Sequence, residues 1–177
     1  KGDFKPQFVF PISTKPAELM DEIYVAGFPF GYRLSSRIKI TRGIVSSLSG
    51  IGDDYSRIQI DAAMQPGNSG GPIYNNFGNI LGVSVAKLDY KFSMKELDTI
   101  PELTNFGINA NMLRSFLTAS NLNLRNEVNS RVSNFGRSIQ NGTFYISCLM
   151  TKKKYYEMKS KKVLFKEVNL SVEEFIN

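Results

Sequence analysis

The chain has 177 residues, of which 42% are hydrophobic and 21% charged, the composition of an ordinary globular domain without a membrane-spanning run of roughly 20 apolar residues. One cysteine and no histidine exclude an intrachain disulfide framework and a zinc site built from thiolate or imidazole ligands. The formal net charge of +6 belongs to the tail, because residues 1–119 hold 12 basic and 11 acidic side chains whereas residues 120–177 hold 10 and 5.

Short strands separated by turn signals are predicted over the first 110 residues, the pattern of an all-β barrel or sandwich. Residues 23–27 are apolar and residues 37–48 are rich in β-branched residues. Residues 56–61 alternate polar and apolar side chains as a half-buried strand does. Asn75–Asn79 is a hairpin signal between two such segments. The expected strands cover residues 23–27, 37–48, 56–61, 73–74 and 80–86.

Helices and a further strand are predicted in the second part of the chain. Residues 88–105 are irregular, and a short helix is expected over 111–119. Apolar side chains recur with helical spacing over 123–140, which predicts a second helix. A strand over 142–150 follows, with 163–168 as its expected pairing partner, and Cys148 within it is expected to be a buried structural thiol.

The segment Gln65–Pro72, which reads QPGNSGGP, places Ser69 between glycines. Glycine lets the backbone turn tightly, so that successive N–H groups can point to the place where an oxyanion forms during acyl transfer. A serine hydroxyl also needs a neighbouring base to become a nucleophile, and the chain contains no histidine. The alternative interpretation is a tight Gly-rich β-turn without chemistry.

Several motifs around this segment resemble the trypsin-fold serine proteases of the HtrA/Deg type, in the order that the family has them. They lie at residues 25–31, 41–47, 58–73, 78–83 and 106–111, and the resemblance covers residues 8–119. It implies a mainly β fold: a six-stranded antiparallel β-barrel, the second of the two trypsin-like barrels, with a C-terminal helix and an α+β tail. We therefore expect a C-terminal protease barrel at 1–119 and a basic helix-plus-strand appendage at 120–177.

The same resemblance implies roles for individual residues. Ser69 is the expected nucleophile, and the N–H groups of Gly67 and Ser69 form the expected oxyanion hole. Ala63 takes the floor of the specificity pocket, where an uncharged residue predicts a small or medium apolar substrate side chain. The other expected substrate-binding residues are Met64 beside the floor, Val85, Ala86 and Lys87 along the substrate backbone, and Gly107, Ile108 and Asn109 on the opposite wall. Met64 and Ile108 equally fit plain barrel core, and Asp61 is expected to have a structural role.

The resemblance implies a serine endopeptidase that works through an acyl-enzyme, here the nucleophile-bearing half without the family's histidine and aspartate. This chain alone is expected to be inactive, and no metal or cofactor is expected. The alternative function is a catalytically incomplete peptide-binding module or pseudoprotease. An extracytoplasmic location, periplasmic or secreted, also follows from the resemblance.

One partner surface is expected besides a protein or peptide substrate, and a second is an alternative. A single barrel leaves an apolar flank, which a missing N-terminal barrel or another chain is expected to cover. The basic cluster Lys152–Lys162 contains two tyrosines and fits contact with nucleic acid or an anionic membrane. We favour a solvated hairpin loop with snorkelling lysines over these contacts.

Overall fold

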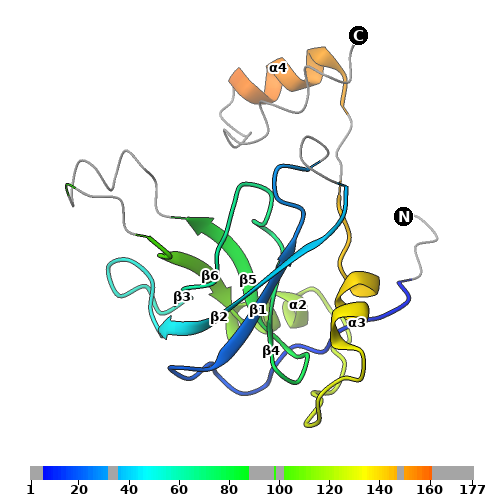
Figure 1. Ribbon diagram of the computed structural model, residues 1–177. Coiled ribbons are helices and arrows are strands. Elements are labelled where there is room, and N and C mark those ends of the chain that lie inside the picture. The colour runs from blue at the N-terminus through cyan, green and yellow to red at the C-terminus, as the bar shows by residue number, and fades with distance from the viewer. Residues whose placement is uncertain (1–5, 32–35, 88–97, 99–101, 147–149, 161–177) are drawn as a thin grey trace. The chain divides into compact units, whose positions relative to one another are not determined.

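The computed structural model describes residues 6–31, 36–87, 98, 102–146 and 150–160 (Figure 1). The chain divides into two compact units, Lys1–Phe144 and Tyr145–Asn177. In the described part of the chain no helix is both long enough and apolar enough to span a bilayer. Cys148 and the predicted strand at 163–168 lie outside the described residues.

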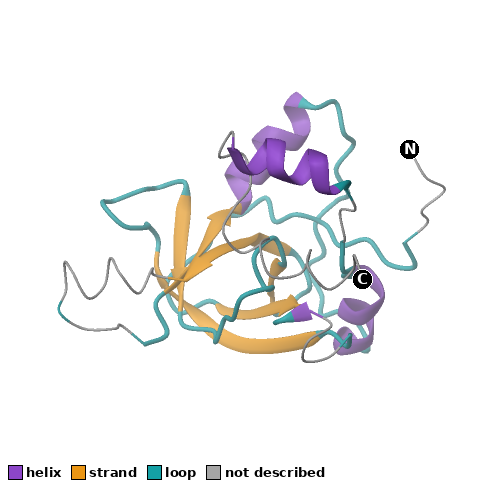
Figure 2. Ribbon diagram, turned by 90° about the horizontal axis from the view of Figure 1, so that it is seen from above, coloured by secondary structure: helices purple, strands orange, loops and turns teal. Residues whose placement is uncertain are grey.

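Six antiparallel strands close into a barrel in the first unit, as the ring of orange strands in Figure 2 shows. The order around the barrel is β1-β2-β3-β6-β5-β4, and pairing of β1 with β4 closes it. This confirms the predicted mainly β, six-stranded antiparallel barrel. The strands are β1 (Glu22–Gly27), β2 (Lys39–Ser47), β3 (Arg57–Ile60), β4 (Pro72–Asn75), β5 (Ile80–Lys87) and β6 (Asn105–Asn109).

The barrel interior is filled by aliphatic side chains that alternate along the strands with outward-facing residues. Ile23 and Val25 of β1, for example, are at most 1% exposed. Burying apolar area of this kind stabilises a fold by about 25 cal/mol per Å². The buried residues of this inner core are Ile23, Val25, Val45, Ile58, Ile60, Ala62, Met64, Ile73 and Leu81.

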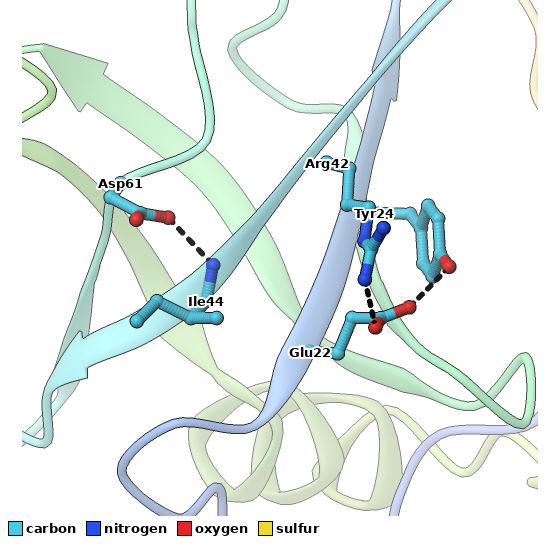
Figure 3. Close-up of polar contacts among 5 residues, drawn as sticks. All are labelled: Glu22, Tyr24, Arg42, Ile44 and Asp61. Atoms are coloured by element: carbon cyan, nitrogen blue, oxygen red, sulfur yellow. Dashed lines mark hydrogen bonds and ion pairs between the residues drawn. The ribbon is translucent and has the colours of Figure 1, made fainter.

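A close approach between β2 and the chain leaving β3 fixes one side of the barrel. The carboxylate of Asp61 accepts a hydrogen bond of 2.6 Å from the N–H of Ile44 (Figure 3). A Cβ atom at Gly43 would collide with that carboxylate and with the backbone of Ala62, so this position requires glycine. The structural role expected for Asp61 is confirmed, although its partner is a strand amide and not a turn.

A second apolar core lies on the outside of the barrel. Ala26 and Tyr74 alternate with inward-facing neighbours, yet they are only 0% and 1% exposed, because Phe10 and the helix α3 (Phe135–Gly142) cover them. The Tyr74 ring lies 4.4 Å from that of Phe10 and 5.9 Å from that of Phe135. Burial raises the pKa of Tyr74 to about 12, and its hydroxyl forms a 3.0 Å hydrogen bond with Thr143.

The predicted helix at 123–140 is wrong over most of its length: residues 122–134, between α2 (Ala110–Ala119) and α3, are not helical, and α3 covers only the end of the predicted range. The backbone here pairs with side chains from the barrel: Asn79 donates to the carbonyl of Val128 at 2.7 Å and accepts from its N–H at 2.9 Å. Asn134 then adopts a left-handed conformation, with φ of 51°, where α3 begins. Tertiary hydrogen bonds therefore override the helical spacing of the apolar residues. The helix predicted at 111–119 is present as α2.

The strand and the basic loop predicted after residue 141 also differ from expectation. Gly142 ends α3 and residues 143–146 have no regular structure, so a strand does not form there; residues 147–149 are not described. The predicted basic loop contains the helix α4 (Lys152–Ser160). Lysine, glutamate and methionine all favour helix, and Thr151 stabilises its start by accepting from the N–H of Lys154 at 3.3 Å.

Glu127 clamps residues 122–134 to the start of the unit, and its loss should destabilise the fold. Its carboxylate accepts hydrogen bonds from the Ser13 hydroxyl at 2.9 Å and from the N–H and hydroxyl of Thr14. Burial alone would raise the pKa of Glu127, but these hydrogen bonds outweigh it and hold the pKa below its ordinary value of 4.5. The clamp therefore stabilises the protein above about pH 4.5 and is lost as the pH falls through the folded-state pKa.

The Glu127→Gln variant should lose roughly 1–3 kcal/mol of unfolding free energy at pH 7. It should also show a weaker loss of stability on acidification than the parent. Urea denaturation at a series of pH values measures both effects. Glu18→Gln, at an exposed position, is the matched control. Equal stability of the two variants would mean that the clamp contributes nothing.

Candidate active site

The loop between β3 and β4 presents Ser69 to solvent. Gly67 has φ of +101° and Gly70 has φ of +84°, values that side chains disfavour. A Cβ atom at Gly67 would also lie 2.5 Å from the carbonyl oxygen of Phe28. The loop passes so close to the chain after β1 that Asn68 is only 4% exposed, while the next residue, Ser69, is exposed. The hydroxyl is therefore accessible, as a nucleophile requires.

Some backbone N–H groups of this loop donate hydrogen bonds within the protein, and others do not. The N–H groups of Asn68, Gly70 and Gly71 donate to the carbonyls of Gln65, Ser84 and Asn68, at 3.0, 2.7 and 2.9 Å respectively. Within the described residues, the N–H groups of Gly67 and Ser69 have no intramolecular acceptor. The two donors left free are the two that the family resemblance implies for the oxyanion hole.

Ser84 of β5 holds the loop in this conformation. Its carbonyl accepts from Gly70, its N–H donates to the carbonyl of Gly71 at 2.9 Å, and its hydroxyl donates to the carbonyls of Asn68 and Gly71. The residue is 0% exposed, so water does not compete for these bonds. Sequence reasoning missed Ser84, although a hydroxyl residue inside the apolar strand 80–86 is a signal for such a partner.

The edge of β5 beyond Ser84 is open on one side. Pairing of β5 with β4 ends at Val83, whereas pairing with β6 continues to Lys87. Among the described residues no strand pairs with Val85–Lys87 along the edge that Ser84 shares with the serine loop. An extended peptide can pair with such an edge. The side chain of Val85 is half-buried, and those of Ala86 and Lys87 are outside the description.

The other predicted substrate-binding residues fall into two groups. Ala63 is exposed, its carbonyl accepts from the Thr41 hydroxyl at 2.9 Å, and Ile108 is 36% exposed on β6. Met64, in contrast, is 4% exposed within the inner core, so core packing describes its side chain.

Gly107 and Asn109 also have structural surroundings. A Cβ atom at Gly107 would collide with the inner-core side chain of Ile73, so this position faces the barrel interior. The Asn109 side chain caps α2 by accepting from the N–H of Met112 at 3.0 Å, and it donates to the carbonyl of Tyr55 at 2.8 Å.

Two buried side-chain amides lie near the loop, and sequence reasoning missed one of them, Asn105. Asn105 donates to the carbonyl of Ala62 at 2.8 Å, which fixes the chain just before Ala63. The side-chain oxygens of Asn68 and Asn105 are buried and, in the part of the chain that the structure describes, have no hydrogen-bond partner. A Cβ atom at Gly27 would lie 2.7 Å from the Asn68 oxygen, so glycine in β1 makes room for this side chain.

Comparison with known proteins gives the class of fold first. Residues 3–83 match the family model of the trypsin-like peptidase domain. This segment includes β1 to β4, the serine loop and the start of β5.

Curated relatives then specify the type. The chain is 39% identical over 99 residues to an uncharacterized protein, y4bJ, of Sinorhizobium fredii, covering 56% of this chain and 16% of the relative. It is 42% identical over 71 residues to Protease Do-like 2, chloroplastic, of Arabidopsis thaliana, covering 37% and 11%. It is 39% identical over 93 residues to a probable periplasmic serine endoprotease, DegP-like, of Rhizobium meliloti, covering 49% and 17%.

These matches confirm the resemblance to trypsin-fold serine proteases of the HtrA/Deg type. The chain spans only about a tenth to a quarter of the length of the curated relatives, from 11% to 27%. The names of the relatives give more than one compartment, chloroplastic for the plant protein and periplasmic for the Rhizobium meliloti protein.

Removal of the Ser84 hydroxyl should release the serine loop. We expect Ser84→Ala to lower the unfolding free energy by roughly 0.5–1.5 kcal/mol, because the hydroxyl hydrogen bonds are lost while the carbonyls of Asn68 and Gly71 keep their backbone N–H donors. Hydrogen exchange of the Gly70 amide should also accelerate. Urea denaturation and NMR-detected exchange measure these effects, with the exposed Ser46→Ala as the control. Unchanged protection of Gly70 would show that the backbone bonds suffice.

Substitution of Gly67 should cost more than substitution of Gly70, although both have positive φ. Alanine at Gly70 meets no atom within 4 Å, so it adds only the conformational cost of roughly 1 kcal/mol. Alanine at Gly67 adds a collision with the backbone of Phe28. Thermal unfolding of the two variants compares them directly, and equal losses would contradict the close packing of the loop.

Proposed function

We propose that the barrel is the nucleophile-bearing half of a serine endopeptidase, with Ser69 as the nucleophile. The observation that supports this most directly is the exposed hydroxyl of Ser69 beside two N–H donors, those of Gly67 and Ser69, that are free within the described part of the chain. The family match and the Do-like relatives agree with this reaction class.

The proposed reaction begins when Ser69 Oγ attacks a peptide carbonyl. The hydroxyl proton passes to a base, and the carbonyl oxygen becomes an oxyanion that accepts from Gly67 and Ser69. Each such donor contributes about 2.7–4 kcal/mol to stabilising the transition state. The base then protonates the leaving amine, and water hydrolyses the acyl-enzyme. Since these 177 residues contain no histidine, the base comes from a segment or chain beyond them.

The proposed substrate is an extended segment of a protein or peptide. Its backbone pairs with the open edge at Val85–Lys87, which continues directly from the Ser84 anchor of the serine loop. Ala63 supplies an uncharged, exposed position, so a small or medium apolar side chain is favoured over lysine or arginine. Gly107, Ile108 and Asn109 contribute the opposite wall through their backbone and the exposed Ile108 side chain.

The chain by itself is proposed to be inactive, because Ser69 has no histidine to accept its proton. An extracytoplasmic location and a partner barrel that carries histidine and aspartate are part of the same proposal.

Complementation tests the assignment of Ser69. The chain is combined with an N-terminal barrel of a Do-like protease that carries histidine and aspartate, and hydrolysis of a peptide library is measured. Ser69→Ala should lower the rate by roughly a millionfold, whereas Ser130→Ala at an exposed position should not change it. Hydrolysis that survives Ser69→Ala would contradict the proposal. Peptide binding without any cleavage would favour the pseudoprotease.

A further inference from the structure

A pocket of about 580 Å³ lies on the outer face of the barrel, within the first unit. Tyr24 of β1 and Ile40 of β2 form one side, and residues 131–136 together with Ile139 form the other. None of the residues proposed for proteolysis lines it. The pocket therefore calls for a separate explanation, beyond the proposed protease.

The walls of the pocket continue the second apolar core to the surface. Its floor includes Ile139, which is 1% exposed and packs with Tyr74 in that core. The rings of Tyr24 and Phe135 meet edge to face with centroids 5.3 Å apart. Ile40 is 40% exposed, so part of the apolar wall faces solvent. An apolar ligand group that covers these side chains would gain the free energy of removing them from water.

The charge at the rim is positive. The carboxylate of Glu22 in β1 already has two hydrogen-bond donors (Figure 3). It accepts one hydrogen bond from the Tyr24 hydroxyl and one of 2.5 Å from the Arg42 guanidinium. Arg131 lines the pocket, and no carboxylate among the described residues lies within ion-pair distance of it. The hydrogen bonds from Tyr24 and Arg42 hold the pKa of Glu22 below its ordinary value, and the positive charge of Arg131 adds to this effect.

We propose that this pocket binds a small organic acid with an apolar body and one carboxylate. The apolar body packs against Tyr24, Ile40 and Phe135, and the carboxylate pairs with Arg131. An inorganic anion would leave the apolar wall exposed, and a neutral hydrocarbon would make no use of the guanidinium. A carboxylate also matches the planar fork of arginine with two parallel hydrogen bonds.

A titration of the whole chain with 3-phenylpropionate, followed by NMR of the backbone amides, tests the site. For a ligand of this size we expect roughly millimolar affinity. The amides of Tyr24, Ile40 and Gly136 should shift, and hexanoate should shift the same amides. The neutral 3-phenylpropanol should bind about tenfold more weakly, since it lacks the charged hydrogen bond.

Variants separate the two parts of the site. Arg131→Gln should weaken 3-phenylpropionate about tenfold and leave 3-phenylpropanol unchanged. Arg137→Gln is the matched control, because Arg137 is exposed on α3 and does not line the pocket. The NMR spectrum of each variant reports whether it is folded.

Three results would overturn the proposal. Equal affinities for the acid and the alcohol would remove the role of the carboxylate. Equal weakening by Arg131→Gln and Arg137→Gln would reduce the effect to net charge. Much tighter binding of a short peptide that ends in phenylalanine, compared with its C-terminal amide and with 3-phenylpropionate, would assign the pocket to chain termini and not to free organic acids.

Discussion

The candidate active site depends on the four hydrogen bonds that Ser84 makes to the loop carrying Ser69. They use the carbonyls of Asn68 and Gly71 and the N–H of Gly70, which leaves the donors on either side of Asn68 free. Because the same residue belongs to β5, the loop and the open strand edge are joined at one point. The positions of the serine loop and of the open strand edge therefore both depend on one buried residue, Ser84.

The barrel could be predicted from the sequence because strands depend on the local alternation of apolar and polar residues and on turn residues between them. Ile23 and Val25 face the inner core as the apolar pattern predicts, and the positive φ of Gly67 and Gly70 agrees with a loop that needs glycine. The role of Ser84 is different, since its partners lie more than ten residues away along the chain. Nothing in the local pattern specifies them.

The helix expected at 123–140 shows the same limit. The spacing of its apolar residues is real, but Asn79 and Ser13 offer hydrogen bonds that a helix would forgo. Polar residues far away in sequence thus decide the conformation of residues 122–134. The pocket beside Arg131 arises in the same way, because residues 131–134 pass over the barrel without forming a helix before α3 begins.

The outer cover of the barrel has a consequence for the order of folding. It joins Phe10, which precedes the first strand, to Phe135 and Thr143, which follow the last one. Contacts at such sequence separation form late, since a long loop must close first. During synthesis by the ribosome, Tyr74 lacks the part of its cover that α3 and Thr143 supply until residue 143 has emerged. A nascent barrel thus exposes part of an aromatic surface while residues 75–143 are made, a stage at which chaperones act.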